Sequence, residues 1–307
     1  MSAASPRADT PDPYPLPAMT AVTTREVTVD GQRLVFDEYG AGPRTVLLLH
    51  GLLLNRRMHR PLAEALAERG SRVICLDLLG HGDSDRPTDM WRYSMPIFSE
   101  QVVAVLDELG IEEAVIGGTS LGANVALEVA VAHPERLRGA IVEMPVLDNA
   151  LLACALAFTP LLVGLTFGAP VTRALGRLAS LVPRGVTNLG DLVLDAVSQD
   201  PGPSAAVIQG IFFDRTAPPR SERSGIETPA LVIGHQRDPI HPFSDSGMLL
   251  GELSRSRLLE ASSILELRLN PERLTGEIAS FVDECWRPAA TRRSRPPRRR
   301  SSGQASA

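Results

Sequence analysis

The chain has 307 residues, of which 44% are hydrophobic and 22% charged, and its formal net charge is −5. This length suits one large α/β domain with an insertion. All 31 basic residues are arginines. The lack of lysine excludes Schiff-base chemistry, pyridoxal phosphate attachment and the phosphate-binding loop that ends in lysine.

The cysteines and histidines argue against disulfides and metal sites. Cys75, Cys154 and Cys285 are widely spaced and odd in number, which predicts buried thiols and a cytoplasmic location. The six histidines contain no H-x-x-x-H pair, and no cysteine pair accompanies them. We therefore expect no metal and no other cofactor. His59 is expected on the surface of a helix.

The two ends of the chain differ in composition from its centre. Residues 1–21 are rich in Pro and Ala, with no basic stretch followed by an apolar one, so we expect a disordered leader and not a signal peptide. Residues 287–307 hold seven arginines and no acid, which predicts a disordered Arg-rich tail. Such tails are often only solvated, and we expect no nucleic-acid partner.

Between residues 22 and 144 the pattern alternates between strand and helix. Asp30-Gly31 separates two strand-like runs and is a typical hairpin turn. The alternation that follows predicts right-handed crossovers and a mostly parallel, twisted sheet flanked by helices. The expected elements are strands at 26–29, 33–38, 45–50, 72–78, 115–118 and 139–144, and helices at 60–69, 97–109 and 121–130.

The central motif is Gly118-Thr119-Ser120-Leu121-Gly122, which matches G-x-S-x-G between a β-branched run and a helical pattern. In such a turn the serine has strained backbone dihedrals, and the glycines avoid collisions with the neighbouring strand and helix. Ser120 is therefore the candidate nucleophile. The N–H of Leu121, at the helix start, is a candidate oxyanion donor.

A second turn follows the strand at 45–50, where the sequence is His50-Gly51-Leu52. The glycine lets the backbone bend over the top of the sheet. The N–H of Leu52 is therefore the second candidate oxyanion donor.

Residues 145–228 interrupt the strand–helix rhythm and predict an inserted helical lid. The segment 149–172 has no charged residue, and its apolar run is long enough to raise the question of a membrane span. Pro160 and Gly164 interrupt that run, and it lies between two strands of one sheet. We expect an apolar roof over a pocket; contact with a membrane or a partner protein is the alternative.

The sheet resumes at 229–234, and Asp238 follows that strand. In parallel sheets, catalytic and binding residues lie at the carboxyl ends of the strands, so Asp238 is the candidate acid that orients a base. A short strand at 256–259 and an amphipathic helix at 271–285 complete the domain.

Together these motifs resemble those of the α/β-hydrolase fold family in order and spacing, over residues 22–286. The resemblance implies a core of 22–144 and 229–286 and a cap at 145–228. It also implies that Ser120 is the nucleophile. A serine at this position argues against the haloalkane dehalogenases and epoxide hydrolases of the family, which need a carboxylate there. The motifs are His50-Gly51-Leu52, Gly80-His81-Gly82-Asp83-Ser84, Gly118-Thr119-Ser120-Leu121-Gly122 and Gly234-His235-Gln236-Arg237-Asp238.

The chain departs from the family pattern at the general base. The family places a histidine on the loop before the closing helix, near Ser263 or Ile264 here, and residues 260–271 contain none. Serine needs a base to attack an acyl carbon. His241 is the favoured substitute, and His50 and His81 are further candidates. Otherwise Ser120 acts without deprotonation, or the site has lost catalysis.

We therefore expect an α/β-hydrolase that acts on a small or medium apolar ester, lactone or related acyl compound. The alternative is a non-hydrolytic or catalytically impaired protein of the same fold that binds or isomerises a hydrophobic ligand.

Overall fold

The computed structural model describes residues 22–185 and 187–287. Within these residues, one sheet of eight strands has the order β1-β2-β4-β3-β5-β6-β7-β8. β2 is antiparallel to both of its neighbours, and the other pairs are parallel. The predicted mostly parallel sheet is confirmed. The strands are β1 (Val22–Val29), β2 (Gln32–Tyr39), β3 (Arg44–Leu49), β4 (Ser71–Leu76), β5 (Ala114–Thr119), β6 (Leu137–Glu143), β7 (Ala230–His235) and β8 (Ser256–Ala261).

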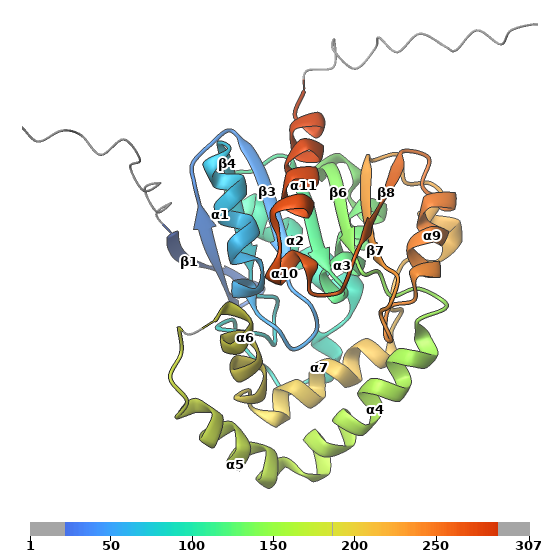
Figure 1. Cartoon of the computed structure of the whole chain (residues 1–307). Helices are drawn as coiled ribbons and strands as arrows, with labels where there is room; N and C mark the ends of the chain where they lie inside the picture. Colours follow the sequence, from blue (N-terminus) through green and yellow to red (C-terminus); the bar gives the residue numbers. More distant parts are fainter. Residues whose placement is uncertain (1–21, 186, 288–307) are drawn as a thin grey trace, which may run out of the picture.

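Helices cover both faces of this sheet, as Figure 1 shows. Side chains alternate along β3: Leu47 and Leu49 pack with residues of α2 and α3, whereas Val46 and Leu48 pack with residues of α1 and α11. The central strands are thus buried on both faces, which explains their continuous apolar runs. These helices are α1 (Arg60–Glu68), α2 (Met95–Glu108), α3 (Leu121–Ala132), α9 (Phe243–Glu252), α10 (Glu266–Leu269) and α11 (Glu272–Cys285), with short 3-10 helices η1 (Arg56–His59), η2 (Met90–Arg92) and η3 (Pro134–Arg136).

Two local expectations can be compared with the structure. Asp30 and Gly31 both have positive φ and form the predicted hairpin turn, in which Val29 pairs with Gln32. His59, in contrast, is buried and not on a helix surface, because its ring donates from Nε2 to the Leu49 carbonyl at 2.9 Å. Burial lowers the pKa of His59 to about 4.

A group of helices connects β6 to β7 and lies against the edge of the sheet where the parallel strands end (Figure 1). Residues 1–21 and 288–307 fall outside the described part, so the expected leader and nearly all of the expected tail lie there. The connecting helices are α4 (Leu151–Phe167), α5 (Ala169–Ser180), α6 (Asn188–Val197), α7 (Pro201–Phe213) and α8 (Arg220–Arg223).

Two further features concern the cysteines and the lengths of the helices. Cys75, Cys154 and Cys285 are all buried, as predicted. Across residues 22–185 and 187–287, no single helix has the length and apolar composition to cross a membrane; α4 and α5 meet the criterion only as a pair, bent by 96°.

The close contact between α3 and β3 leads to a prediction about stability. A Cβ on Gly122 would lie 2.6 Å from the carbonyl carbon of Leu49, which is a steric overlap with backbone. We expect Gly122→Ala to lower the free energy of unfolding by about 1–3 kcal/mol, measured by urea denaturation. The matched control is Gly276→Ala in α11, where a Cβ meets no atom within 4 Å; it should stabilise by about 0.5–1 kcal/mol. Equal effects of the two substitutions would contradict the prediction.

Candidate active site

Ser120 occupies the sharp turn between β5 and α3. Its backbone has φ +54° and ψ −109°, a strained combination for a residue with a Cβ. A Cβ on Gly118 would lie 2.7 Å from the Leu49 carbonyl oxygen, so this turn requires glycine. The side chain of Ser120 consequently stands at the end of the sheet, half-buried, where it lines a pocket.

Two side chains from the loop after β7 complete a chain of hydrogen bonds to Ser120. The Nδ1 atom of His241 lies 2.8 Å from a carboxylate oxygen of Asp238, and its Nε2 lies 2.9 Å from the Ser120 Oγ. With Nδ1–H donating to the carboxylate, Nε2 is left to accept from the serine hydroxyl. The favoured sequence candidate for the base therefore lies within hydrogen-bond reach of the candidate nucleophile, Ser120.

Asp238 uses its two oxygens for different tasks. Oδ1 accepts the backbone N–H groups of Ile240 and His241, at 2.8 and 3.0 Å, while Oδ2 faces the imidazole. Burial raises the pKa of Asp238, but the bonds from His241 and Ile240 outweigh burial and lower it below its ordinary value. One carboxylate thus shapes the loop and orients the ring three residues later.

The other histidine candidates do not reach Ser120. His50 donates from Nδ1 to the Gly51 carbonyl and accepts from the Leu78 N–H at Nε2, so both ring nitrogens are occupied. The Nδ1 of His81 lies 3.0 Å from the Leu79 carbonyl. Both rings are fully buried, and burial lowers their pKa values. Ser263, where the family resemblance implied a histidine, instead offers its carbonyl to His235.

The two expected oxyanion donors belong to residues that line the same pocket, Leu52 and Leu121. Leu121 is the first residue of α3, so its N–H has no partner within the helix. Leu52 follows Gly51 at the end of β3 and lines the pocket together with Ser120 and Leu121. The next residue, Leu53, has φ +57°, and its carbonyl accepts the side-chain amide of Gln199 at 2.6 Å. The connecting helices therefore hold the Leu52 loop.

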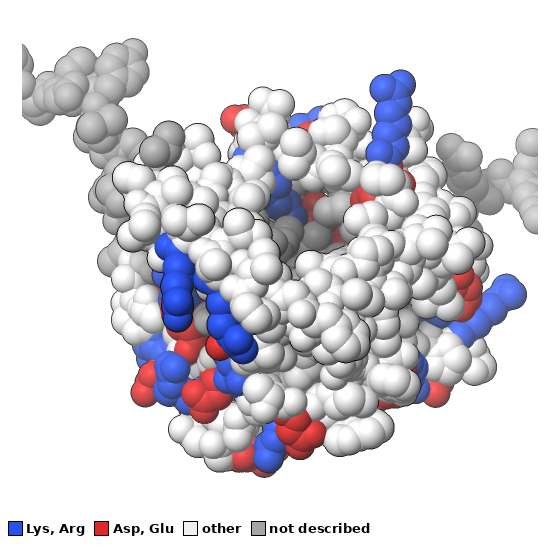
Figure 2. All heavy atoms as spheres, turned by 90° about the horizontal axis from the view of Figure 1, so that it is seen from below, with Lys and Arg blue, Asp and Glu red and all other residues white. Residues whose placement is uncertain are grey.

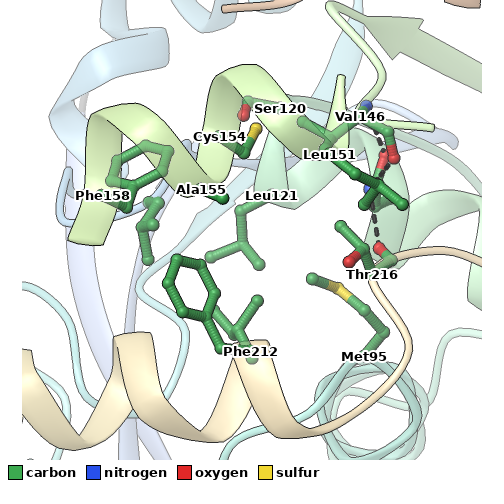
Figure 3. Close-up of a pocket in the computed structure, with 13 residues that line it drawn as sticks. Met95, Ser120, Leu121, Val146, Leu151, Cys154, Ala155, Phe158, Phe212 and Thr216 are labelled. Carbon is green, nitrogen blue, oxygen red and sulfur yellow. Dashed lines mark hydrogen bonds between the residues drawn. The ribbon is translucent and has the colours of Figure 1, made fainter. Parts of the chain in front are cut away.

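The pocket beside Ser120 is a cavity of about 300 Å³. Figure 3 shows side chains of α4 above it and Phe212 of α7 below it. The Asn124 amide in its wall is engaged by backbone groups of Val146 and Thr216, so it offers little to a ligand. The surface is mostly apolar. The lining residues are Leu52, Met95, Ser120, Leu121, Asn124, Val146, Leu151, Cys154, Ala155, Phe158, Ile211, Phe212 and Thr216.

A buried ion pair that the sequence analysis missed lies behind the turn. Glu143, at the end of β6, is buried and accepts from Arg268 at 2.8 Å and from the Thr119 hydroxyl. The Glu143 carbonyl also accepts the N–H of Ser120 at 2.9 Å. Burial raises the pKa of Glu143, but Arg268, together with the hydrogen bonds from His235 and Thr119, outweighs burial and holds the pKa well below 4.5. The only sign of this ion pair in the sequence is that an acidic residue, Glu143, ends a mostly apolar strand.

This ion pair predicts a reversal in the pH dependence of stability. Above its ordinary pKa of 4.5, ionised Glu143 stabilises the wild type, and that contribution is lost as the pH falls. In Arg268→Met the carboxylate has lost its counter-charge, so burial raises its pKa and stability falls as the pH rises instead. We expect a loss of about 3–5 kcal/mol near pH 7, measured by urea denaturation between about pH 3 and pH 8, a range that spans the ordinary pKa of Glu143.

The double variant Glu143→Gln with Arg268→Met is the control, because it removes both charges of this ion pair. It should recover much of the lost stability, and this site should no longer make the free energy of unfolding depend on pH. If the free energy of unfolding of Arg268→Met changed with pH as that of the wild type does, Arg268 would not be the counter-charge of Glu143.

Comparison with known proteins agrees with the fold. A family model described as alpha/beta hydrolase fold matches residues 44–161. A rat protein named bifunctional epoxide hydrolase 2 is 38% identical over 128 residues, which cover 41% of this chain and only 23% of the rat protein. The AB hydrolase superfamily protein YisY of Bacillus subtilis is 28% identical over 246 residues, covering 74% of this chain and 85% of YisY.

Among solved structures, an enol-lactonase from Burkholderia xenovorans superposes with a TM-score of 0.68. It is 22% identical, and the alignment covers 84% of this chain and all of the lactonase. The sheet order, the serine turn and these matches show that the chain has the α/β-hydrolase fold. Across the described residues, no cluster of three or more His, Cys, Asp or Glu side chains could hold a metal ion.

Proposed function

We propose that the chain is a serine hydrolase in which Ser120 is the nucleophile, His241 the general base and Asp238 the acid that orients it. The observation that carries the proposal is the 2.9 Å contact between the His241 Nε2 and the Ser120 Oγ, with Asp238 on the far side of the ring. A nucleophile, a base and an orienting carboxylate in this order activate a serine on several unrelated folds.

The chemistry follows from this arrangement. The Ser120 oxygen attacks the carbonyl carbon while its proton moves to the Nε2 of His241. The imidazolium then protonates the leaving oxygen, and the acyl group remains on Ser120. A water molecule, deprotonated by the same nitrogen, then attacks the acyl carbon. The bond from that carbon to the Ser120 oxygen breaks, the imidazolium returns its proton to this oxygen, and the acid is released. Asp238 stays ionised throughout and stabilises the charged ring, in keeping with its lowered pKa.

The negative charge on the substrate oxygen needs donors that are in place before the reaction. In the proposal these are the backbone N–H groups of Leu52 and Leu121, from the turns that end β3 and β5. Backbone amides in such turns reorganise little as the charge develops. The start of α3 adds the positive end of a helix dipole at the same point.

The pocket supports an apolar acyl compound as substrate. Its walls are mainly Leu, Met, Phe and Ile side chains, and the volume of about 300 Å³ suits a small or medium molecule. We therefore propose an ester, a lactone or a related acyl compound. By the family resemblance, epoxide hydrolases need a carboxylate at this position for alkyl chemistry, whereas the serine at position 120 suits acyl chemistry.

The alternative function, ligand binding or isomerisation without hydrolysis, depended on the lack of a base near Ser120. The His241 contact removes the reason for preferring it. No other observation among the described residues favours that alternative.

A fluorophosphonate probe tests the proposal, because it reacts only with an activated serine. We expect rapid labelling of the wild type, none in Ser120→Ala, and a rate lowered by at least about 10³-fold in His241→Ala. The matched control is His133→Ala at the end of α3, whose ring faces Glu100; it should label like the wild type. Folded wild-type protein that fails to label, or a His241→Ala variant with an unchanged rate, would refute the assignment.

The hydrogen bond from Gln199 to the loop of Leu52 generates a second kinetic prediction. Gln199→Leu leaves the Leu53 carbonyl without this donor and lets the loop of Leu52 and Leu53, here called the oxyanion loop, relax. We expect kcat for a short apolar ester to fall about tenfold, within the about 10²–10³-fold that loss of a whole oxyanion donor costs. The Michaelis constant should change less than about twofold, since the pocket is intact.

Gln32→Leu, in the remote hairpin between β1 and β2, controls for the change of side chain. A Gln199→Leu variant that raises the Michaelis constant and leaves kcat unchanged would show that Gln199 acts on binding and not on the oxyanion loop.

A further inference from the structure

The α4 helix has two apolar faces, and the pocket accounts for only one of them. Leu151, Cys154, Ala155 and Phe158 line the cavity beside Ser120. An outward stripe, defined as Leu152, Leu156, Val163 and Phe167, recurs at spacings of four and seven on another side of the helix. Among the described residues, Leu152, Leu156 and Phe167 are some of the most exposed hydrophobic side chains, at 72%, 69% and 83%, and Val163 is 50% exposed.

The next helix, α5, continues this surface. Val171, Leu175 and Leu178 are exposed and follow one another at spacings of four and three, whereas Thr172, Gly176 and Ala179 lie on the inner side. Figure 2 views the molecule from the side of these helices and shows a broad uncharged surface around a central hollow. Exposed apolar patches of this kind mark interaction sites.

The segment that carries these apolar residues has charges of one sign, and the acids Asp148 and Asp191 lie just outside it. Residues 149–190 contain three arginines and no Asp or Glu, in a chain whose net charge is −5. Arg173 and Arg177, one turn apart on α5, have no ion-pair partner among the described residues, whereas Arg184 pairs with Asp195. Two unpaired arginines next to an apolar stripe complement an apolar layer that carries anionic groups.

We propose that the outward faces of α4 and α5 dock onto the surface of an anionic lipid bilayer. The apolar stripe would enter the boundary between headgroups and acyl chains, and Arg173 and Arg177 would contact lipid phosphates. A second copy of the chain fits less well, because a two-fold contact through this face would bring like charges together without acids to pair them.

The pocket lies directly behind this surface, since α4 contributes to both. Docking would place the apolar cavity next to the bilayer and favour substrates that partition into lipid. Docking itself is independent of the reaction, but this substrate class rests on the proposed hydrolase function.

Flotation of the full-length protein with lipid vesicles tests the proposal. We use vesicles of phosphatidylcholine alone and of phosphatidylcholine with phosphatidylglycerol. The wild type should float with the anionic vesicles, and the double variant Leu156→Ser with Phe167→Ser should lower the partition coefficient at least about tenfold. Arg173→Glu with Arg177→Glu should lower it about tenfold or more on anionic vesicles and little on neutral ones.

The control is Leu250→Ser on α9, a 44% exposed leucine outside this surface, which should float like the wild type. Failure of the wild type to float would overturn the proposal, and equal flotation with both kinds of vesicle would overturn the role of the arginines. A dimer in size-exclusion chromatography with light scattering, lost in the Leu156→Ser and Phe167→Ser variant and accompanied by no flotation, would assign the surface to self-association and overturn docking.

Fluorophosphonate labelling separates this proposal from the hydrolase function. Leu156 and Phe167 do not line the pocket, so their double variant should label in solution at the wild-type rate while it fails to float. Flotation without labelling would refute the hydrolase and leave docking intact.

Discussion

The structure depends on one close approach, where β3, β5 and the start of α3 meet around Gly118 and Gly122. A Cβ on either glycine would overlap with the backbone of Leu49. Because the chain can turn so sharply there, Ser120 adopts a positive φ and its hydroxyl stands clear of the sheet. The adjacent pocket, the N–H at the helix start and the contact with His241 all require that position.

The candidate base and its acid share a single short loop after β7. Asp238 accepts the backbone N–H of His241 with one oxygen and faces its ring with the other, so loop and imidazole are fixed together. The loop after β8, where the family resemblance implied a histidine, is thereby freed. This loop and the following helix, α10, contribute structural contacts instead: the Ser263 carbonyl accepts from His235, and Arg268 of α10 pairs with Glu143 beside the turn.

The helices between β6 and β7 act on the site from two directions. α4 roofs the pocket with one side while its other side forms the proposed bilayer surface. Gln199, just after α6, bonds the Leu53 carbonyl and so supports the loop of an expected oxyanion donor. The same segment therefore bears on substrate access and on the preorganisation of the site.

Local sequence was sufficient for the parallel sheet, the hairpin at Asp30-Gly31 and the serine turn, because apolar periodicity and glycine spacing report burial and backbone geometry directly. It also singled out Ser120, Asp238 and, among several candidates, His241. Tertiary structure alone decided which imidazole reaches Ser120, because that depends on how loops from distant strands converge at one edge of the sheet. The burial of His59 and the pairing of Glu143 with Arg268 likewise could not be predicted from the sequence pattern. Both depend on tertiary contacts, and Glu143 and Arg268, 125 residues apart, leave no periodic signal.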